Sequence, residues 1–254
     1  MAISLSTTIL PNTIQRSRIT ILPSPRVSRN LGFSLSFRPC NESIELSSSR
    51  SVITASAASG SPGIESSTVS DDTTNLLDRA QVFDLNGNGI PISDLWKDRK
   101  AVVAFARHFG CVFCRKRADL LASQKDRMDA SGVALVLIGP GSIDQAKAFT
   151  EQTNFKGEVY ADPSHSSYEV LGFVSGVLST FTPQAGLKII QLYMEGYRQD
   201  WGLSFQRDTM TRGGWQQGGI IVAGPGKSNI SYIHKDKEAG DDPDMEDILN
   251  ACCS

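Results

Sequence analysis

Two uninterrupted apolar runs, residues 101–105 and 133–138, dominate the pattern of hydrophobic and polar positions along this chain. An unbroken run of that length predicts a strand buried on both faces. Each run is followed by apolar positions three and four residues apart, which predict helices over 114–128 and from Ser142 onward. A shorter strand is expected at 158–162. The order β-α-β-α-β predicts parallel strands joined by right-handed crossovers.

The flanking segments predict further elements on either side of this unit. Two extended pieces around the Asn86-Gly87 turn indicate a hairpin. A long insertion, 172–212, contains a helix with Thr182 as its cap and Pro183 at its first position. The other elements expected are a helix at 75–80, a turn at 94–97 capped by Ser93, a helical turn at 164–171, antiparallel strands at 220–223 and 231–234, and a last helix capped by Asp242.

The first 55 residues have the composition of an organelle transit peptide. They contain no Asp or Glu before Glu42, five Arg up to Arg38 and many Ser and Thr, and they lack a compact apolar segment. Dense Ser without an Arg-rich amphipathic helix favours the chloroplast, and the stroma within it, over the mitochondrion. A disordered tail without a targeting role is the alternative. Cleavage is expected near Ala55, followed by a flexible linker at 56–72 and one α/β domain at 73–254.

Charge supports this division of the chain. Residues 1–55 carry a net charge of +4, whereas the remainder carries −6. A mildly acidic domain lacks the basic footprint of a nucleic-acid-binding protein. The longest central apolar run, 133–138, is far shorter than the ~20 residues that a membrane span needs. We therefore expect neither a nucleic-acid partner nor an integral membrane segment.

The candidate chemistry lies at Cys111 and Cys114, between the strand at 101–105 and the helix that follows. A strand, a sharp turn, Cys-x-x-Cys and a helix are together typical of a redox pair. At a helix N-terminus, unpaired N–H groups and the macrodipole favour a thiolate. Arg107 and the cations at 115–117 act in the same direction. Cys111 is therefore predicted to be the nucleophile and Cys114 the resolving thiol, with no metal or bound cofactor.

Other interpretations of these residues stay open from the sequence alone. The two cysteines could be inert and buried, or form half of a zinc site, for which the only other candidates in the mature region are Cys252 and Cys253. His108 could donate a proton to the sulfur pair, although a structural hydrogen-bonding role is the commoner one. Phe113, inside the motif, is expected to be exposed because the turn must be accessible.

The motif and its surroundings resemble the peroxiredoxin-like 2 group of the thioredoxin-like superfamily, which contains the AhpC/TSA antioxidant-enzyme-domain proteins. The resemblance covers roughly residues 75–250. It implies an α/β fold with a central mixed sheet flanked by helices and an insertion before the last two strands. It rests on the Asn86-Gly87 hairpin followed by Ser93-Asp-Leu-Trp96, the run from Arg107 to Arg115, the strand ending Leu137-Ile-Gly139, and the segment 218–222.

The chain departs from the peroxiredoxin pattern at its peroxide-activating positions. In Pro-x-x-x-Thr-x-x-Cys, the Pro position is Ala104 and the Thr position is His108. The later Arg falls at Gln217, and Arg107 or Arg212 could replace it. The cis-Pro that thioredoxins place opposite the motif corresponds to Gly218 or Gly219, which would let a bulky substrate approach closely.

The resemblance implies a thiol-disulfide or peroxide oxidoreductase of antioxidant type, re-reduced by a thioredoxin-type donor. Some relatives reduce endoperoxides of prostaglandin-type lipids, so a lipid peroxide is among the expected substrates. The alternative is a binding or regulatory module that kept the thioredoxin fold without effective catalysis, which the lost Thr, Arg and cis-Pro would explain.

Overall fold

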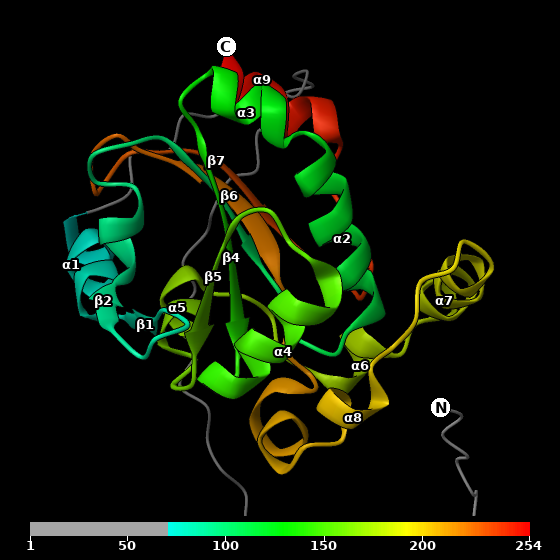
Figure 1. Ribbon diagram of the computed structural model, residues 1–254. Coiled ribbons are helices and arrows are strands. Elements are labelled where there is room, and N and C mark those ends of the chain that lie inside the picture. Colours follow the sequence, from blue (N-terminus) through cyan, green and yellow to red (C-terminus); the bar gives the residue numbers. More distant parts are fainter. Residues whose placement is uncertain (1–70) are drawn as a thin grey trace, which may run out of the picture. The chain divides into compact units, whose positions relative to one another are not determined.

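The computed structural model describes residues 71–254, and the predicted transit peptide and most of the predicted linker lie outside them. A seven-stranded mixed sheet runs through the domain in the order β2-β1-β5-β4-β3-β6-β7 (Figure 1). The strands are β1 (Gln81–Phe83), β2 (Gly89–Pro91), β3 (Ala101–Phe105), β4 (Ala134–Pro140), β5 (Glu158–Asp162), β6 (Gly219–Ala223) and β7 (Ile230–Lys235).

The central strands confirm the predicted α/β class. Strand β3 is parallel to β4, and β4 is parallel to β5, whereas β6 pairs antiparallel with β3 and β7 antiparallel with β6. Side chains alternate between two cores, as the twofold period of a strand requires. Val102 and Ala104 of β3 face one core, while Val103 and Phe105 face the other. A strand covered on both sides has no polar position, which explains the unbroken apolar run.

Helices cover both faces of the sheet (Figure 1). The first core packs against α2, α4 and α9, and the second against α1, η1 and α5. The helices are α1 (Asp71–Arg79), η1 (Ile92–Leu95), α2 (Val112–Ser123), α3 (Lys125–Ala130), α4 (Ile143–Thr153), α5 (Ser166–Leu171), α6 (Val177–Thr180), α7 (Pro183–Met194), α8 (Trp201–Ser204), η2 (Thr209–Gly213) and α9 (Met245–Cys253).

Two predicted caps are confirmed by their hydrogen bonds. Ser142 accepts from the backbone N–H of Gln145, whose side chain bonds back to the Ser142 N–H, so α4 begins with a capping box. Thr182 accepts from the backbone N–H of Ala185 at 3.0 Å and starts α7, with Pro183 at the first position. These local signals survive because each needs only residues within one turn of the chain.

Three local predictions are wrong. Ser93 does not cap η1, because its hydroxyl hydrogen-bonds Asp78 of α1. Asp244, not Asp242, caps α9, and Asp242 instead pairs with Arg117 of α2. The helix expected over 114–128 is interrupted at Gln124, where α2 ends and α3 begins. In the first two cases a partner distant in sequence took the side chain that a local rule had assigned.

The long insertion before β6 is present and mostly helical. It contains α6, α7, α8 and η2, and Figure 1 shows α7 at the edge of the domain, on the side of α2. Several of its large apolar side chains are exposed, including Leu178, Phe181 and Met194. None of the helices among the described residues is long and apolar enough to cross a membrane.

Candidate active site

The two motif cysteines lie at the start of α2, just after the turn that connects it to β3. Cys111 occupies the N-cap position of α2, and Cys114 follows one turn later. Both are free thiols. The backbone N–H of Arg107, just past the end of β3, donates to the Cys114 sulfur at 3.1 Å. The predicted strand, turn and helix therefore bring both sulfurs to the carboxyl end of the central strand, on one side of the helix start.

The two thiols differ in their ionisation. A hydrogen bond from the Cys114 side chain holds the pKa of Cys111 well below its usual range, and the charge of Arg107 adds to this effect, while burial opposes it. Burial raises the pKa of Cys114 well above its usual range, and the neighbouring Cys111 sulfur raises it further. One sulfur is thus suited to be a thiolate and the other to remain a thiol, as a nucleophile and a resolving partner require.

Arg107 supplies the nearest positive charge. Its side chain is buried, and Nη1 lies 3.7 Å from the Cys111 sulfur. The guanidinium comes from the residue two positions after β3 and not from position 217, where peroxiredoxins carry their later Arg. Gln217 is fully buried and bonds to Ser179 and Thr180 of α6. Of the alternatives raised from the sequence, Arg107 lies beside the sulfur, and the side chain of Arg212 lies outside the described part.

The start of α2 offers the Cys111 thiolate fewer free backbone N–H groups than an open helix terminus would. The backbone N–H of Val112, the first residue of the helix, donates to Oε1 of Gln199 at 2.9 Å. The backbone N–H of Cys114, in contrast, bonds to the Cys111 sulfur and lowers its pKa. Stabilisation of the thiolate at this end therefore comes from one donor of the first turn, while the insertion takes another.

His108 stands at the position of the peroxiredoxin Thr. It is buried, and burial lowers its pKa to about 4, so the ring is neutral at physiological pH. Its Nδ1 has no hydrogen-bond partner within the described residues. A buried, unpartnered ring nitrogen costs free energy, which argues against the purely structural role that the sequence favoured. A neutral imidazole with a free nitrogen can accept a hydrogen bond or a proton.

The buried His108 predicts an acid-sensitive fold. Below about pH 6.5 the unfolded chain protonates this residue, whereas the folded chain does so only near pH 4, so the unfolded state binds more protons in this window. The free energy of unfolding should therefore fall as pH drops, by up to about 1.4 kcal/mol per pH unit from this group. When the free energy of unfolding is measured by urea between pH 6.5 and 4 and plotted against pH, His108→Asn should give a shallower slope than the wild type. Equal slopes would show that His108 is not a buried neutral group with a lowered pKa.

Both sulfurs are covered, which corrects the expectation of an accessible turn. Cys111 is 1% exposed, Cys114 is 5% exposed, and Phe113 is buried as well, so its predicted exposure is wrong. The cover comes from the insertion. The backbone N–H of Asp200 donates to the Gly110 carbonyl at 2.9 Å, and a Cβ on Gly110 would lie 2.5 Å from the Ser204 hydroxyl oxygen of α8. The turn predicted to face solvent is thus packed beneath α8.

Gly218 and Gly219 have a packing role in the sheet. A Cβ on Gly218 would lie 2.0 Å from the carbonyl oxygen of Phe105, and one on Gly219 would lie 2.2 Å from the carbonyl oxygen of His234. The space at these positions is filled by the protein's own strands, so the expectation that it admits a substrate is corrected. Within the described residues the cis peptide bond is Gly224–Pro225, in the turn after β6.

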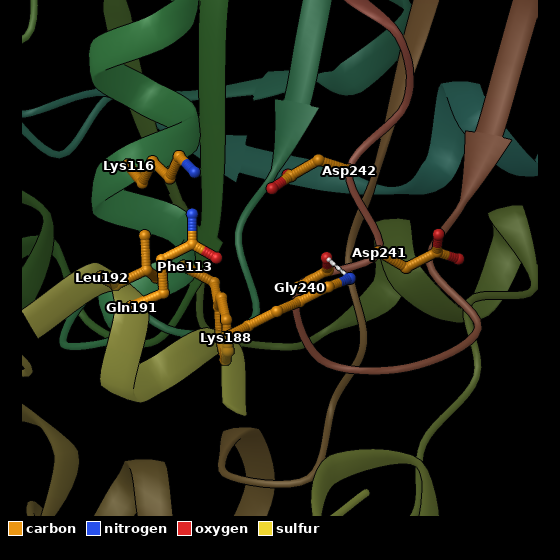
Figure 2. Close-up of a pocket in the computed structure, with 8 residues that line it drawn as sticks. All are labelled: Phe113, Lys116, Lys188, Gln191, Leu192, Gly240, Asp241 and Asp242. Carbon is orange, nitrogen blue, oxygen red and sulfur yellow. Dashed lines mark hydrogen bonds between the residues drawn. The ribbon is translucent and has the colours of Figure 1, made fainter. Parts of the chain in front are cut away.

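A cavity of about 240 Å³ adjoins the outer side of the motif helix. Figure 2 shows Phe113 and Lys116 of α2 on one side of it and residues of α7 beside them. Lys188 of α7 donates to the Gly240 carbonyl at 2.8 Å and so ties the insertion to the loop before α9. Of the residues that line this cavity, Phe113 is the one within the Cys-x-x-Cys motif.

The remaining cysteines do not join the site as metal ligands. Among residues 71–254 no group of three or more His, Cys, Asp or Glu side chains is placed to hold a metal ion. Cys252 and Cys253 lie in α9 with their sulfurs 3.1 Å apart, and burial raises the pKa of Cys252 to about 12. Cys252 is therefore a protonated core thiol at neutral pH.

Sequence reasoning missed the residues that surround Arg107 and the start of α2. Thr180 and Gln199 reach the motif from the insertion, and the carbonyls of Gly214 and Gln216 reach it from the loop that follows. No local pattern marks them, because each is an ordinary polar group at least 70 positions away in sequence. The one available signal was Gln217, a polar residue at the position where the peroxiredoxin pattern has an ionic one.

Known proteins are similar in sequence to much of this chain. The sequence model of the AhpC/TSA antioxidant enzyme family matches residues 120–238, which begins just after the motif. Thioredoxin-like protein AAED1, chloroplastic, of Arabidopsis thaliana is 62% identical over 100% of both chains. Peroxiredoxin-like 2C of Homo sapiens is 30% identical over 66% of this chain and 75% of that protein.

Two further comparisons extend the set. Prostamide/prostaglandin F synthase of Salmo salar is 31% identical over 70% of this chain and 84% of that protein. A solved structure of reduced Prx3 from Vibrio vulnificus, in complex with hydrogen peroxide, has a TM-score of 0.48 at 16% identity and covers 69% of this chain and 95% of that one. The fold described above rests on the strand order and pairing of this chain itself.

The full-length similarity to a chloroplastic protein confirms the predicted localisation in the chloroplast. The match to the Arabidopsis protein covers the whole chain, including the sheet, the motif and the insertion, and the match to peroxiredoxin-like 2C covers 66% of it. This chain belongs to the AhpC/TSA antioxidant-enzyme family of thioredoxin-like proteins, in its peroxiredoxin-like 2 group.

Proposed function

We propose that this protein is a thiol-dependent oxidoreductase in which Cys111 is the nucleophile and Cys114 the resolving thiol. One observation carries the proposal: the side chain and backbone N–H of Cys114, together with Arg107, all act on the Cys111 sulfur to favour the thiolate. A thiolate beside a protonated thiol is the arrangement that both peroxide reduction and disulfide exchange need. The protein works in the stroma and needs no bound cofactor.

With a hydroperoxide the reaction has three balanced steps. The Cys111 thiolate attacks the oxygen that bears the hydrogen, the O–O bond breaks, and the departing alkoxide takes a proton to give an alcohol, which leaves a sulfenic acid on Cys111. The Cys114 thiol then attacks that sulfur, forming the 111–114 disulfide and releasing water. With an endoperoxide the first step leaves a sulfenate ester on Cys111, and the attack of Cys114 releases the second alcohol in place of water. A thioredoxin-type dithiol finally reduces the disulfide and is itself oxidised. With a disulfide substrate, the first step instead forms a mixed disulfide and releases a thiol.

Substrate access requires the cover over the sulfurs to open. The contacts to be released are those of Asp200 and Gln199 with the Gly110–Val112 turn. A lipid-derived peroxide belongs to the proposed substrate class, because one relative is a prostamide/prostaglandin F synthase. If opening limits the rate, the oxidation rate should saturate as the peroxide concentration rises.

The test is a stopped-flow panel of hydrogen peroxide, a lipid hydroperoxide and an endoperoxide against the reduced full-length protein. Trypsin releases both cysteines in one peptide, residues 108–115, so disulfide formation appears there as the loss of two hydrogens. We expect at least one peroxide to form this disulfide within the mixing experiment. Failure of all three peroxides, and of a model disulfide, would contradict the proposal.

A second candidate function is a thioredoxin-fold binding module with weak catalysis. The burial of both sulfurs favours it, together with the missing Thr and Arg of the peroxiredoxin pattern. The two functions differ in the ionisation of Cys111. A Cys111 pKa near the free value of about 8.5, read from thiolate absorbance as pH is varied, would favour the binding module.

A further inference from the structure

The guanidinium of Arg107 is held by Thr180 of the insertion and by two carbonyls of the loop between the insertion and β6. Its Nε donates to the Gln216 carbonyl at 3.2 Å, and Nη2 donates to the Gly214 carbonyl at 3.3 Å and to the Thr180 hydroxyl at 3.2 Å. These bonds leave Nη1 directed at the Cys111 sulfur. Two of the three acceptors are backbone carbonyls, whereas Thr180 is the side chain that holds the outer edge of the guanidinium.

Thr180 is itself fixed by three partners. Its hydroxyl oxygen accepts from Nε2 of Gln217 at 2.9 Å as well as from Arg107, and it donates its own proton to the Gly176 carbonyl at 3.0 Å. Gln217 is fully buried, and its amide also reaches Ser179 at 3.3 Å. The oxygen of Thr180 therefore has one orientation in which both of its acceptor positions and its proton are used.

We propose that Thr180 is a positioning residue for the redox centre: its hydroxyl, fixed by Gln217, holds Arg107 in the orientation that directs Nη1 at the Cys111 sulfur. The inference rests on the proposed function, because it concerns the thiolate form of Cys111. Gln217 stands where the peroxiredoxin pattern has an Arg. In this proposal it helps to place Arg107, which follows β3. Helix α6 thereby couples the insertion to the reactivity of the sulfur.

The physical reason lies in the geometry of the guanidinium. A planar fork on a flexible stem points its charge in a fixed direction only as closely as its acceptors hold it. Without the Thr180 oxygen, the Gln216 and Gly214 carbonyls still hold Nε and Nη2, but the outer edge of the guanidinium loses its side-chain acceptor. The group can then tilt further, so the average distance from Nη1 to the sulfur grows. The attraction between a cation and a thiolate weakens with that distance.

The experiment compares Thr180→Val with Thr180→Ser in the full-length protein. Valine has nearly the same shape but no acceptor, whereas serine keeps the hydroxyl. Alkylation of Cys111 by iodoacetamide is followed across pH, with fragment ions of peptide 108–115 distinguishing Cys111 from Cys114. Because only the thiolate reacts, the inflection of the rate profile reports ionisation, and the plateau at high pH reports access.

We expect Thr180→Val to move the inflection to higher pH and to slow alkylation at pH 6 by about three- to tenfold relative to its own plateau. Thr180→Ser should restore the wild-type inflection. Gln217→Met should move it in the same direction by less, and it decides the question if Thr180→Val does not fold. An unmoved inflection in the folded valine variant, or in Gln217→Met if only that variant folds, overturns the inference.

Thr182→Val is the matched control. It removes the cap of α7 and loosens the insertion, but it makes no contact with Arg107. Its inflection should stay at the wild-type value even if its plateau rises. An equal shift in Thr182→Val would mean that general loosening is the cause and would overturn the role of Thr180. A wild-type inflection near the ordinary cysteine value would instead remove the proposed function itself, so the two failures are distinguishable.

Discussion

Cys111→Ser should lower thiol-dependent turnover by roughly a thousandfold, because a serine hydroxyl is not ionised at neutral pH and the thiolate is the attacking group. Cys114→Ser should behave differently. It should still complete the first chemical step but accumulate a sulfenic acid or mixed disulfide on Cys111, since no second sulfur displaces it. Single-turnover oxidation followed by mass analysis of the intact protein separates the two variants.

Cys252→Ser and Cys253→Ser are the controls for this pair. Burial raises the pKa of Cys252 to about 12, so it contributes no thiolate at neutral pH, and neither residue contacts the motif in any bond described above. Both variants should keep wild-type turnover. Full activity in Cys111→Ser and in Cys114→Ser alike would show that the reaction does not pass through this sulfur pair.

Arg117→Leu should destabilise the domain by about 3–5 kcal/mol, the cost typical of a buried charge left without its partner. Arg117 of α2 is buried and bonds to Asp236 at 3.0 Å and to Asp242 at 2.6 Å. Burial alone would lower the pKa of Arg117, but these two carboxylates more than offset it and the pKa is raised. Asp236 is 2% exposed, so its charge would remain in the interior after the substitution. Urea unfolding monitored by circular dichroism measures the loss.

Two variants separate charge from packing in this measurement. Arg127 of α3 pairs with Glu246 at 3.6 Å, but both side chains are more than half exposed, so Arg127→Leu should change the unfolding free energy by less than about 1 kcal/mol. The double variant Arg117→Leu, Asp236→Leu should be more stable than Arg117→Leu alone, because it removes the more deeply buried of the two carboxylates that lose Arg117. If Arg117→Leu lowers the free energy of unfolding no more than Arg127→Leu does, the role of Arg117 as a buried, stabilising charge is contradicted.

In the proposed mechanism, the thiol of Cys111 is activated by residues other than those of a typical peroxiredoxin. The positive charge comes from Arg107 at the end of β3, and His108 takes the place of the Thr. The neutral His108, whose Nδ1 has no hydrogen-bond partner among the described residues, lies among the groups that act on Cys111, and a hydroperoxide offers an O–H that such a nitrogen can accept. The residues that make the polar contacts therefore differ from those of the peroxiredoxin pattern, but a cation and a hydrogen-bond acceptor still lie beside the sulfur.

The covered sulfur pair gives the insertion a direct part in reactivity. Thr180, Gln199 and Asp200 contact the motif from two stretches of the insertion, the end of α6 and the residues just before α8. The same segments expose Leu178, Phe181 and Trp201 on their outer side. Releasing the Gln199 and Asp200 contacts would uncover the turn and free the Val112 N–H at the start of α2, whereas the bonds that orient Arg107 come from Thr180, Gly214 and Gln216.

The sequence by itself determined the parts of this protein that depend on neighbours along the chain. The buried strands at β3 and β4 followed from unbroken apolar runs, the starts of α4 and α7 from Ser142 and Thr182, and the place of two cysteines one turn apart at a helix start from their spacing after the strand. Strand burial, capping and the Cys-x-x-Cys spacing are set within a few residues, so a linear pattern carries them.

Only the tertiary structure decided which groups surround the sulfurs and whether solvent reaches them. Arg107 lies beside Cys111 because carbonyls and a hydroxyl more than 70 positions away orient it, and α8 buries a turn that every local rule places at the surface. Ser93 and Asp242 likewise left their local caps for distant partners. A side chain's hydrogen-bonding groups go to whichever partner the fold brings close, and that choice depends on contacts that no short window of sequence contains.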